Sequence, residues 1–294
     1  MKEAKTIDEQ IELMRSRNIE IPDEAKARES LLDIGYYRLG FFSFPFEKGF
    51  PFKKNRLLHR DHIIVDGTSF SDIVSLYYFD TDLRNLITPY LNRIEISLRT
   101  FLTYTTSVKY KKAPTWFVNP KYVNQTYIDK FDEKVYNRIK GNPVIKRHHK
   151  KYINDKYAPA WKTMEFMALG EILTLYNNIR DEVLKEEVAR NYGCSVDAFC
   201  SYFETIRVLR NHCAHGTCIY NMSLPKGILG SGAAGTFNGN DRHNINGTIR
   251  VVKYILGKIS QNRLNEFESK LTELLTTKRN ENVNAAIRAC GGLL

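Results

Sequence analysis

The segment from Phe203 to Asn221, FETIRVLRNHCAHGTCIYN, concentrates side chains that bind phosphate and exchange protons. Two arginines, an asparagine and two histidines lie within the nine residues from Arg207 to His215. Arginine offers a fixed fork of donors for phosphate oxygens, and histidine accepts and donates protons near neutral pH. These groups suit cleavage of RNA without a metal. A histidine would take the proton of a ribose 2′-OH, and guanidinium groups would stabilise the charge that develops as this oxygen attacks phosphorus.

A helix must position these side chains. Ser195 is a suitable N-cap, and apolar residues from Phe199 to Cys213 gather on one side of a wheel drawn at about 100° per residue. His212 lies on the flank, and Gly216 is expected to end the helix at His215. The opposite arc holds Arg207, Arg210, Asn211, Ala214 and His215.

The bare Arg-x4-His spacing occurs by chance in a chain of this composition, and Arg207 to His212 is an overlapping second copy. The alternative is therefore a surface helix whose Arg and Asn pair with acidic neighbours and whose histidines are incidental.

Charge and cysteine usage narrow the class of protein. Lys and Arg number 44 against 33 Asp and Glu, which gives a net charge of +11 and favours a polyanionic partner such as RNA, although simple solubility is the alternative. The 5 cysteines form no CxxC pair, which is typical of a reducing compartment. No signal peptide or apolar membrane span is visible. We expect a cytoplasmic protein with no membrane association, no cofactor and no metal.

A second basic cluster lies in IKRHHKKY, from Ile145 to Tyr152. Such a run is usually a solvated face, but histidine and tyrosine between the cations also fit a surface that contacts RNA. The sequence leaves both interpretations open. The candidate RNA-binding residues are Lys146, Arg147, His148, His149, Lys150 and Lys151.

The remaining pattern predicts a mainly α protein. We expect helices over 6–18, 23–34, 70–109, 161–180, 181–192, 249–258 and 262–277, with Pro89 kinking or dividing the third. The segment GYYRLGFFSFPF after residue 34 is rich in aromatics and glycine and predicts a buried turn with an extended segment. Residues 47–69 predict a hairpin or irregular loop, the Gly-rich stretch after Leu224 a mobile loop or insertion, and the C-terminus a frayed tail.

Four segments carry a family resemblance. They are RNHCAH at 210–215 with Asn221 after it, LLDIGYYRLGFFSFPF at 31–46, LNRIEISLRT at 91–100 and PAWKTMEFMALGEILTLY at 159–176. In this order they resemble the Abi-like abortive-infection proteins, the AbiD/AbiF group of phage-defence proteins. That family is related to the HEPN superfamily of helical domains, which includes RNA-cutting toxins. Many relatives carry a second His and an Arg-Leu-Trp-Asn run after CAH, where this chain has Gly216 and TCIYN.

The resemblance implies a HEPN-like helical bundle at 70–294, with the Gly-rich loop near 226–247, and a small helical and irregular subdomain at 1–69. It implies that Arg210 and His215 are catalytic, with Asn211 as a polar neighbour. The expected supporting residues are Glu95, Arg207 and His212. The plain alternative for Glu95 is an ion pair with Arg99, four residues away.

The function that the resemblance implies is metal-independent cleavage of RNA in phage defence. HEPN nucleases combine two Arg/His motifs and this chain has one convincing copy, so a homodimer is expected. One alternative is an RNA-binding protein that holds a structured small non-coding RNA without cutting it. Another is a sensor of phage proteins in which the motif is structural.

Overall fold

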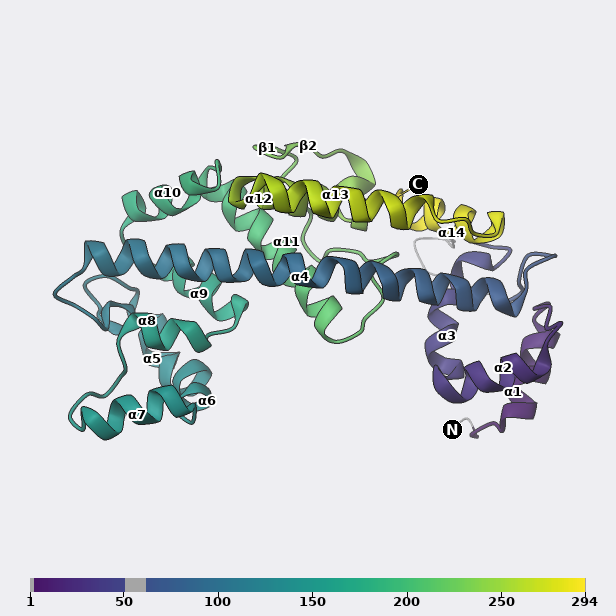
Figure 1. Ribbon diagram of the computed structural model, residues 1–294, viewed down its shortest axis with the longest axis horizontal. Coiled ribbons are helices and arrows are strands. Elements are labelled where there is room, and N and C mark those ends of the chain that lie inside the picture. The colour runs from purple at the N-terminus through teal and green to yellow at the C-terminus, as the bar shows by residue number, and fades with distance from the viewer. Residues whose placement is uncertain (1–2, 51–61, 294) are drawn as a thin grey trace.

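The computed structural model describes residues 3–50 and 62–293, and the chain is mainly helical, as predicted. Helix α4, Phe70–Lys109, runs along the length of the molecule; α11 (Val196–Ala214) crosses behind it, and most other helices lie above or below it (Figure 1). In the described part of the chain, the strands are β1, Ser231–Gly232, and β2, Gly235–Thr236, which pair antiparallel. No helix within the described ranges is both long and apolar enough to cross a bilayer.

Helix α4 is a single helix of 40 residues, so of the two effects expected of Pro89, a kink or a division, the division is wrong. Ser69 caps its first turn in a capping box with Asp72, and apolar residues at three and four residue spacing bury one stripe along its length. Pro89 itself is exposed. The backbone carbonyl that it deprives of a partner therefore lies on the solvent side, where water can satisfy it, and the buried stripe holds the helix together.

A second layer covers α4 on one side. It contains α11, Val196–Ala214, α12, Ile245–Ile259, α13, Gln261–Thr276, and α14, Glu281–Gly291 (Figure 1). Helix α14 corrects the expected frayed tail: Val283 and Ile287 are buried, and Asn280 caps its start. The short apolar pattern of this tail becomes a helix because α4 offers it a surface to pack against.

The N-terminal lobe consists of α1, Ile7–Ser16, α2, Glu24–Asp33, and α3, Tyr36–Ser43, followed by the 3-10 turn Phe44–Phe46. The predicted extended segment at GYYRLGFF is wrong, because Gly35 at φ +90° only separates two helices. Leu39 and Phe42 bury one face of α3. From 47 to 69, Glu47 and Ile64 form an isolated bridge, and 51–61 lie outside the described residues.

The opposite lobe follows the C-terminal end of α4. It comprises the 3-10 turn Trp116–Val118, α5 (Gln125–Phe131), a π-helical turn (Asp132–Tyr136), α6 (Asn137–Ile139), α7 (Pro143–Lys151), α8 (Ala160–Thr163), the 3-10 turn Met164–Phe166 and α9 (Leu169–Asn178). Helix α10, Glu182–Asn191, then leads to α11.

The helix predicted over 161–180 is instead α8, the 3-10 turn and α9, since Met167 and Ala168 are extended. The Glu171 side chain accepts the Ala168 N–H at 2.7 Å and starts a new helix there. Apolar residues of this stretch are nevertheless buried, among them Met164, Met167, Ile172, Leu175, Tyr176 and Ile179.

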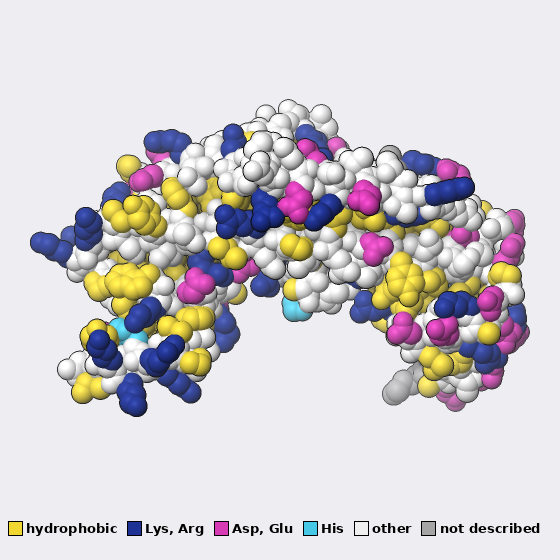
Figure 2. Space-filling model, in the orientation of Figure 1, with side chains coloured by type: hydrophobic (Ala, Val, Ile, Leu, Met, Phe, Trp, Pro, Cys, Tyr) yellow, Lys and Arg dark blue, Asp and Glu magenta, His cyan; other side chains and the backbone are white. Residues whose placement is uncertain are grey.

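The N-terminal lobe and the opposite lobe lie on the same side of α4, at its two ends. The molecule therefore has the outline of an arch with a concave underside (Figure 2). The Gly-rich segment lies on the opposite, upper side. It is attached to α11, because the Tyr202 hydroxyl accepts the Ala234 N–H at 2.9 Å and Ser201 Oγ accepts the Leu229 N–H at 2.8 Å. Phe237 is buried. The proposed boundary between 69 and 70 coincides with the N-cap of α4.

Candidate functional site

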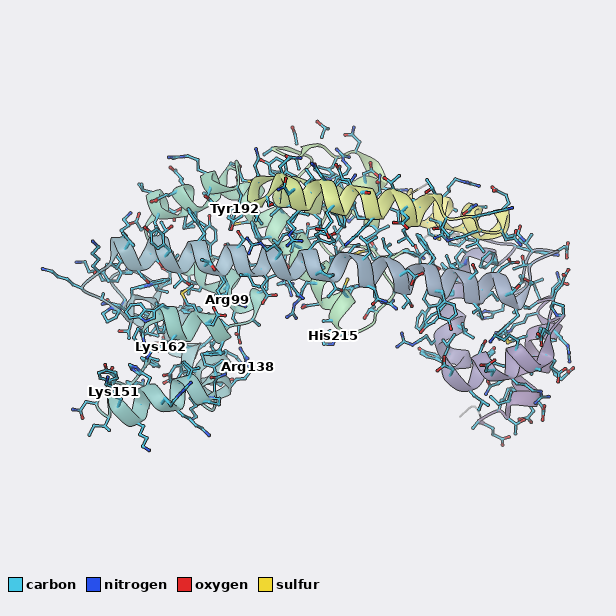
Figure 3. The ribbon with its side chains drawn as sticks, in the orientation of Figure 1. Arg99, Arg138, Lys151, Lys162, Tyr192 and His215 are labelled. Atoms are coloured by element: carbon cyan, nitrogen blue, oxygen red, sulfur yellow. The ribbon has the colours of Figure 1, made fainter. Side chains whose placement is uncertain are left out.

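Helix α11 positions the Arg/His segment as predicted. Ser195 Oγ accepts the Ala198 N–H at 3.2 Å, and the apolar face from Phe199 to Leu209 is buried. The helix ends at the expected place: His215 is the C-cap, and Gly216 turns the chain at φ +64°. The end of α11 lies on the concave underside of the arch, where the side chain of His215 projects between the two lobes (Figure 3).

The structure brings Arg210 and Glu95 together. Arg210 Nε donates to Glu95 Oε2 at 3.2 Å, while Arg99 Nη2 donates to Glu95 Oε1 at 2.7 Å. Glu95 therefore forms the ion pair with Arg99 on α4 that the plain alternative predicts, and it also contacts Arg210, the arginine of the motif. Arg99 is fixed further by the Met167 carbonyl at 3.0 Å. This leaves the Arg210 side chain 34% exposed, and neither of its Nη atoms has a hydrogen-bond partner among residues 3–50 and 62–293.

His215 and Asn211 are held through the backbone. The His215 N–H donates to the Asn211 carbonyl at 3.0 Å, and His215 is exposed. Within the described part of the chain the imidazole of His215 and the side-chain amide of Asn211 make no hydrogen bond, so both are available to a ligand. The two ends of the motif, Arg210 and His215, are about 7–8 Å apart along the helix axis at 1.5 Å per residue.

The overlapping copy, Arg207 and His212, is used by the fold. Arg207 Nε and Nη2 donate to the two carboxylate oxygens of Glu204 at 2.7 and 2.5 Å. His212 Nδ1 donates to the Cys218 carbonyl at 3.3 Å, which ties the chain after the helix back to its last turns. Pairing with an acidic neighbour, the alternative for this helix, thus occurs at both arginines: Glu204 binds two nitrogens of Arg207, whereas Glu95 binds only Nε of Arg210.

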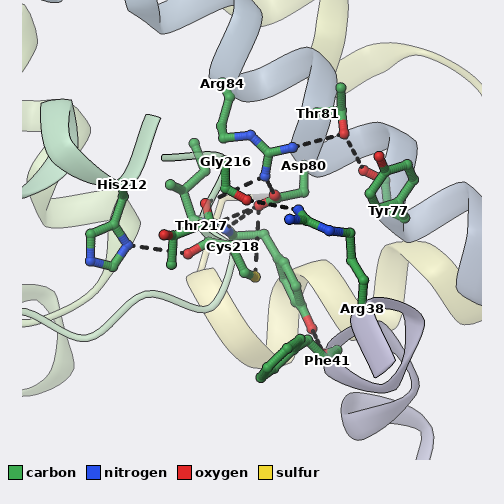
Figure 4. A network of polar contacts seen from close by, with 12 residues as sticks. Arg38, Phe41, Tyr77, Asp80, Thr81, Arg84, His212, Gly216, Thr217 and Cys218 are labelled. Atoms are coloured by element: carbon green, nitrogen blue, oxygen red, sulfur yellow. Dashed lines mark hydrogen bonds and ion pairs between the residues drawn. The ribbon is translucent and has the colours of Figure 1, made fainter. Parts of the chain in front are cut away.

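A buried ion pair holds the chain that follows His215 (Figure 4). Asp80 of α4 is fully buried and pairs with Arg84, and its Oδ1 accepts the N–H groups of Ile219 and Tyr220 at 2.8 and 2.7 Å. Burial raises the pKa of Asp80, while Arg84 and these N–H groups oppose that rise. Asp80 thus fixes the backbone that returns from α11 to α4.

Sequence reasoning missed Asp80 and Arg84, and also Arg38 of α3, whose Nη1 donates to the Gly216 carbonyl at 2.9 Å. A signal for the first two exists. They stand four residues apart within the apolar stripe of α4, next to buried Leu83, where a charged pair is unusual. No comparable signal marks Arg38, because its partner is a backbone atom 178 residues away.

The cysteines near the motif are protonated thiols at neutral pH. Burial raises the pKa of Cys213 to about 11 and raises that of Cys218 further. Neither is therefore suited to act as a nucleophile. Over residues 3–50 and 62–293, no group of three or more His, Cys, Asp and Glu side chains is placed to hold a metal ion.

The second basic cluster lies apart from the motif, on α7 in the far lobe (Figure 1). His148 is buried and its Nε2 lies 3.0 Å from Asp155 Oδ2, while His149 Nε2 lies 2.6 Å from the Tyr136 hydroxyl. Both histidines thus take part in packing. The exposed cations of the run are Lys146, Arg147, Lys150 and Lys151.

Comparison with known proteins agrees with the sequence resemblance. A family model described as Abi-like protein matches residues 29–221, well over half of the 294 residues. The match begins in α2 and ends just beyond the segment held by Asp80, so it includes Glu95, Arg210 and His215. No curated protein and no solved structure matches the chain. The chain therefore belongs to the Abi-like protein family, whose name associates it with abortive infection, a form of defence against phage.

Proposed function

We propose that this protein is a phage-defence endoribonuclease that cuts RNA without a metal ion, through a HEPN-like domain at 70–294 that follows the subdomain at 1–69. The observation that carries the proposal is the state of Arg210. Glu95 holds its Nε, the side chain is 34% exposed, and neither terminal nitrogen has a partner in the described chain. A guanidinium held in this way keeps its charge and orientation and offers two donors to the oxygens of a phosphate.

In this proposal His215 exchanges the protons. Its imidazole removes the proton of the 2′-OH, the 2′ oxygen forms a bond to phosphorus, and the bond from phosphorus to the 5′ oxygen breaks. A proton from an imidazolium or from water then neutralises the leaving 5′ oxygen. The products carry a 2′,3′-cyclic phosphate and a 5′-OH. Asn211, with a free side-chain amide one turn before His215, supplies a further polar contact to the substrate.

A symmetric homodimer would bring two such motifs together, so that the histidine of one chain acts as base and that of the other as acid. The position of His215 on an open concave surface leaves room for a second chain (Figure 3). Measurement of the mass of the protein in solution tests this part. A monodisperse monomer that still cuts RNA would remove it.

The direct test is RNA cleavage in EDTA by wild-type protein, His215→Ala and Arg210→Ala. Both variants should lose cleavage, about 100-fold or more, because each removes a group that acts in the transition state. Arg190→Ala is the matched control, since Arg190 is an exposed helical arginine 4.0 Å from its acidic partner, Glu186. Equal cleavage by wild type and His215→Ala, or none by wild type under any condition, would exclude the catalytic assignment.

The second candidate function is binding of a structured small non-coding RNA without cleavage. The four exposed cations of α7 favour it, because they gather on one lobe, away from Arg210, where phosphate contacts would serve affinity alone (Figure 2). Sequencing of RNA that copurifies with the protein distinguishes the two. One intact species of defined length supports binding, whereas toxicity that His215→Ala abolishes supports cleavage.

A further inference from the structure

Helix α3 carries two exposed aromatic side chains beside His215. Tyr37 is 82% exposed and Phe41 53% exposed, although Leu39 and Phe42 on the other face of the same helix are buried. The two rings touch edge to face, with their centroids 5.4 Å apart. Packing of the core therefore accounts for only half of the aromatic segment GYYRLGFF, and the exposed half requires another explanation.

These rings and His215 line one cavity. It measures about 320 Å³, and its walls are Tyr37, Arg38, Phe41 and Phe42 from α3 together with the chain from His215 to Cys218. Its size is at the low end for ligand pockets, which suits one small planar group. The cavity therefore lies between the N-terminal lobe and the end of α11, and both contribute to its walls.

Hydrogen bonds and ring packing hold the walls of this cavity in place. Arg38 Nη1 donates to the Gly216 carbonyl at 2.9 Å, and the Tyr220 hydroxyl donates to the Phe41 carbonyl at 3.2 Å. Tyr220 also stacks on Phe42, with centroids 5.6 Å apart, and its own N–H is bound to buried Asp80. The exposed rings therefore stand on a fixed base next to His215, which reduces the entropy lost when a ligand stacks on them.

We propose that Tyr37 and Phe41 form a stacking site for one unpaired base of an RNA strand, adjacent to the nucleotide on which His215 acts. This inference rests on the proposed function and assigns its substrate class: single-stranded RNA or an unpaired loop. Aromatic faces bind any base by stacking, provided that the base is outside a duplex. The occupant is RNA because Arg38 and His215 in the same cavity complement phosphate, and the whole chain carries a net charge of +11.

The test is binding, measured with His215→Ala protein in EDTA so that the RNA stays intact. The probe is a fluorescent single-stranded oligoribonucleotide of mixed sequence, compared with the same strand in a perfect duplex. Tyr37→Ser should weaken binding of the single strand about 5- to 150-fold, since stacking of one base contributes about 1–3 kcal/mol. Binding of the duplex should be much less affected, and Tyr37→Phe should bind as the parent does.

Tyr104→Ser is the matched control, because Tyr104 is a 67% exposed tyrosine far along α4 from Asp80. Its affinity should equal that of the parent. Unchanged affinity in both Tyr37→Ser and Phe41→Ser, equal loss in Tyr104→Ser, or no RNA binding at all would overturn the stacking site. So would a change of mass in solution caused by Tyr37→Ser, which would assign the rings to contact between two copies of the chain.

Cleavage is scored separately with protein that keeps His215. If wild type binds single strands through Tyr37 but cuts none, the proposed nuclease fails and the stacking site stands. If wild type cuts and both Tyr37→Ser and Phe41→Ser bind normally, the stacking site fails and the nuclease stands.

Discussion

Helix α11 carries two overlapping copies of the Arg-x4-His pattern, and the two copies differ in how many of their polar atoms are already hydrogen-bonded. In the first copy, Arg207 donates hydrogen bonds from Nε and Nη2 to Glu204, and His212 donates one to the Cys218 carbonyl. In the copy three residues later, Arg210 is held at one nitrogen only, and the imidazole of His215 is exposed at the end of the helix. Identical spacing therefore says little about function. The difference lies in which polar atoms the fold has already satisfied.

The largest effect should come from Asp80, which supports both copies. Asp80→Ala leaves Arg84 without its carboxylate in a buried place and releases the N–H groups of Ile219 and Tyr220. We expect a loss of about 3–5 kcal/mol in the free energy of unfolding, measured by denaturant titration. Cleavage should also fall, because the chain after His215 is released. A stability within 1 kcal/mol of wild type, by contrast, would show that the pair contributes far less than its burial indicates.

A smaller effect should follow from Glu95→Gln, which bears on the second copy alone. The amide keeps the shape of Glu95 but removes the charge that orients Arg210 and Arg99. We expect about a tenfold loss of cleavage, equivalent to about 1.4 kcal/mol, with the larger part in kcat.

Steady-state kinetics check the change at Glu95. Glu95→Asp should recover part of the rate, whereas a merely structural role would show as a lowered unfolding midpoint with normal kcat. Arg190→Ala again serves as the control for a general change in surface charge.

His212→Ala tests the structural copy. Loss of its hydrogen bond to the Cys218 carbonyl should cost about 1 kcal/mol in the free energy of unfolding. The folded fraction should keep its rate of cleavage, apart from any loosening of the turn at Gly216. The two quantities are measured on the same preparation, and a loss of cleavage as large as that in His215→Ala would mean that the wrong histidine has been chosen.

The smallest effect is expected for Arg207→Ala. Its partner, Glu204, lies three residues earlier on the same helix, and both side chains are partly exposed. The ion pair therefore contributes at most about 0.5 kcal/mol to the free energy of unfolding. Unfolding and cleavage should both lie close to wild type. A pronounced loss of RNA cleavage with normal stability would return Arg207 to the site.

Local patterns were sufficient for much of this architecture. Ser195, Gly216 and the apolar spacing predict both ends of α11, and the helical wheel separates His215 from His212. The mainly α class and the family also follow from the sequence. These features depend on residues within one helix or on a motif that is continuous in the chain.

Other features depend on distant partners. Helix α3 forms although its sequence is rich in glycine and aromatics, because Leu39 and Phe42 find the core. Glu95 meets Arg210 across 115 residues, and Arg38 meets Gly216 across 178. No periodicity encodes such contacts. The resemblance suggested a role for Glu95, but only the fold shows which atoms of Arg210 it leaves free.

The comparison of the two copies is tested most directly by RNA cleavage in EDTA with His215→Ala and His212→Ala side by side. We predict that His215→Ala loses at least 100-fold of the wild-type rate with an unchanged unfolding midpoint, while His212→Ala cuts RNA to cyclic phosphate ends at nearly the wild-type rate but unfolds more easily. Equal rates in wild type and His215→Ala would contradict the account.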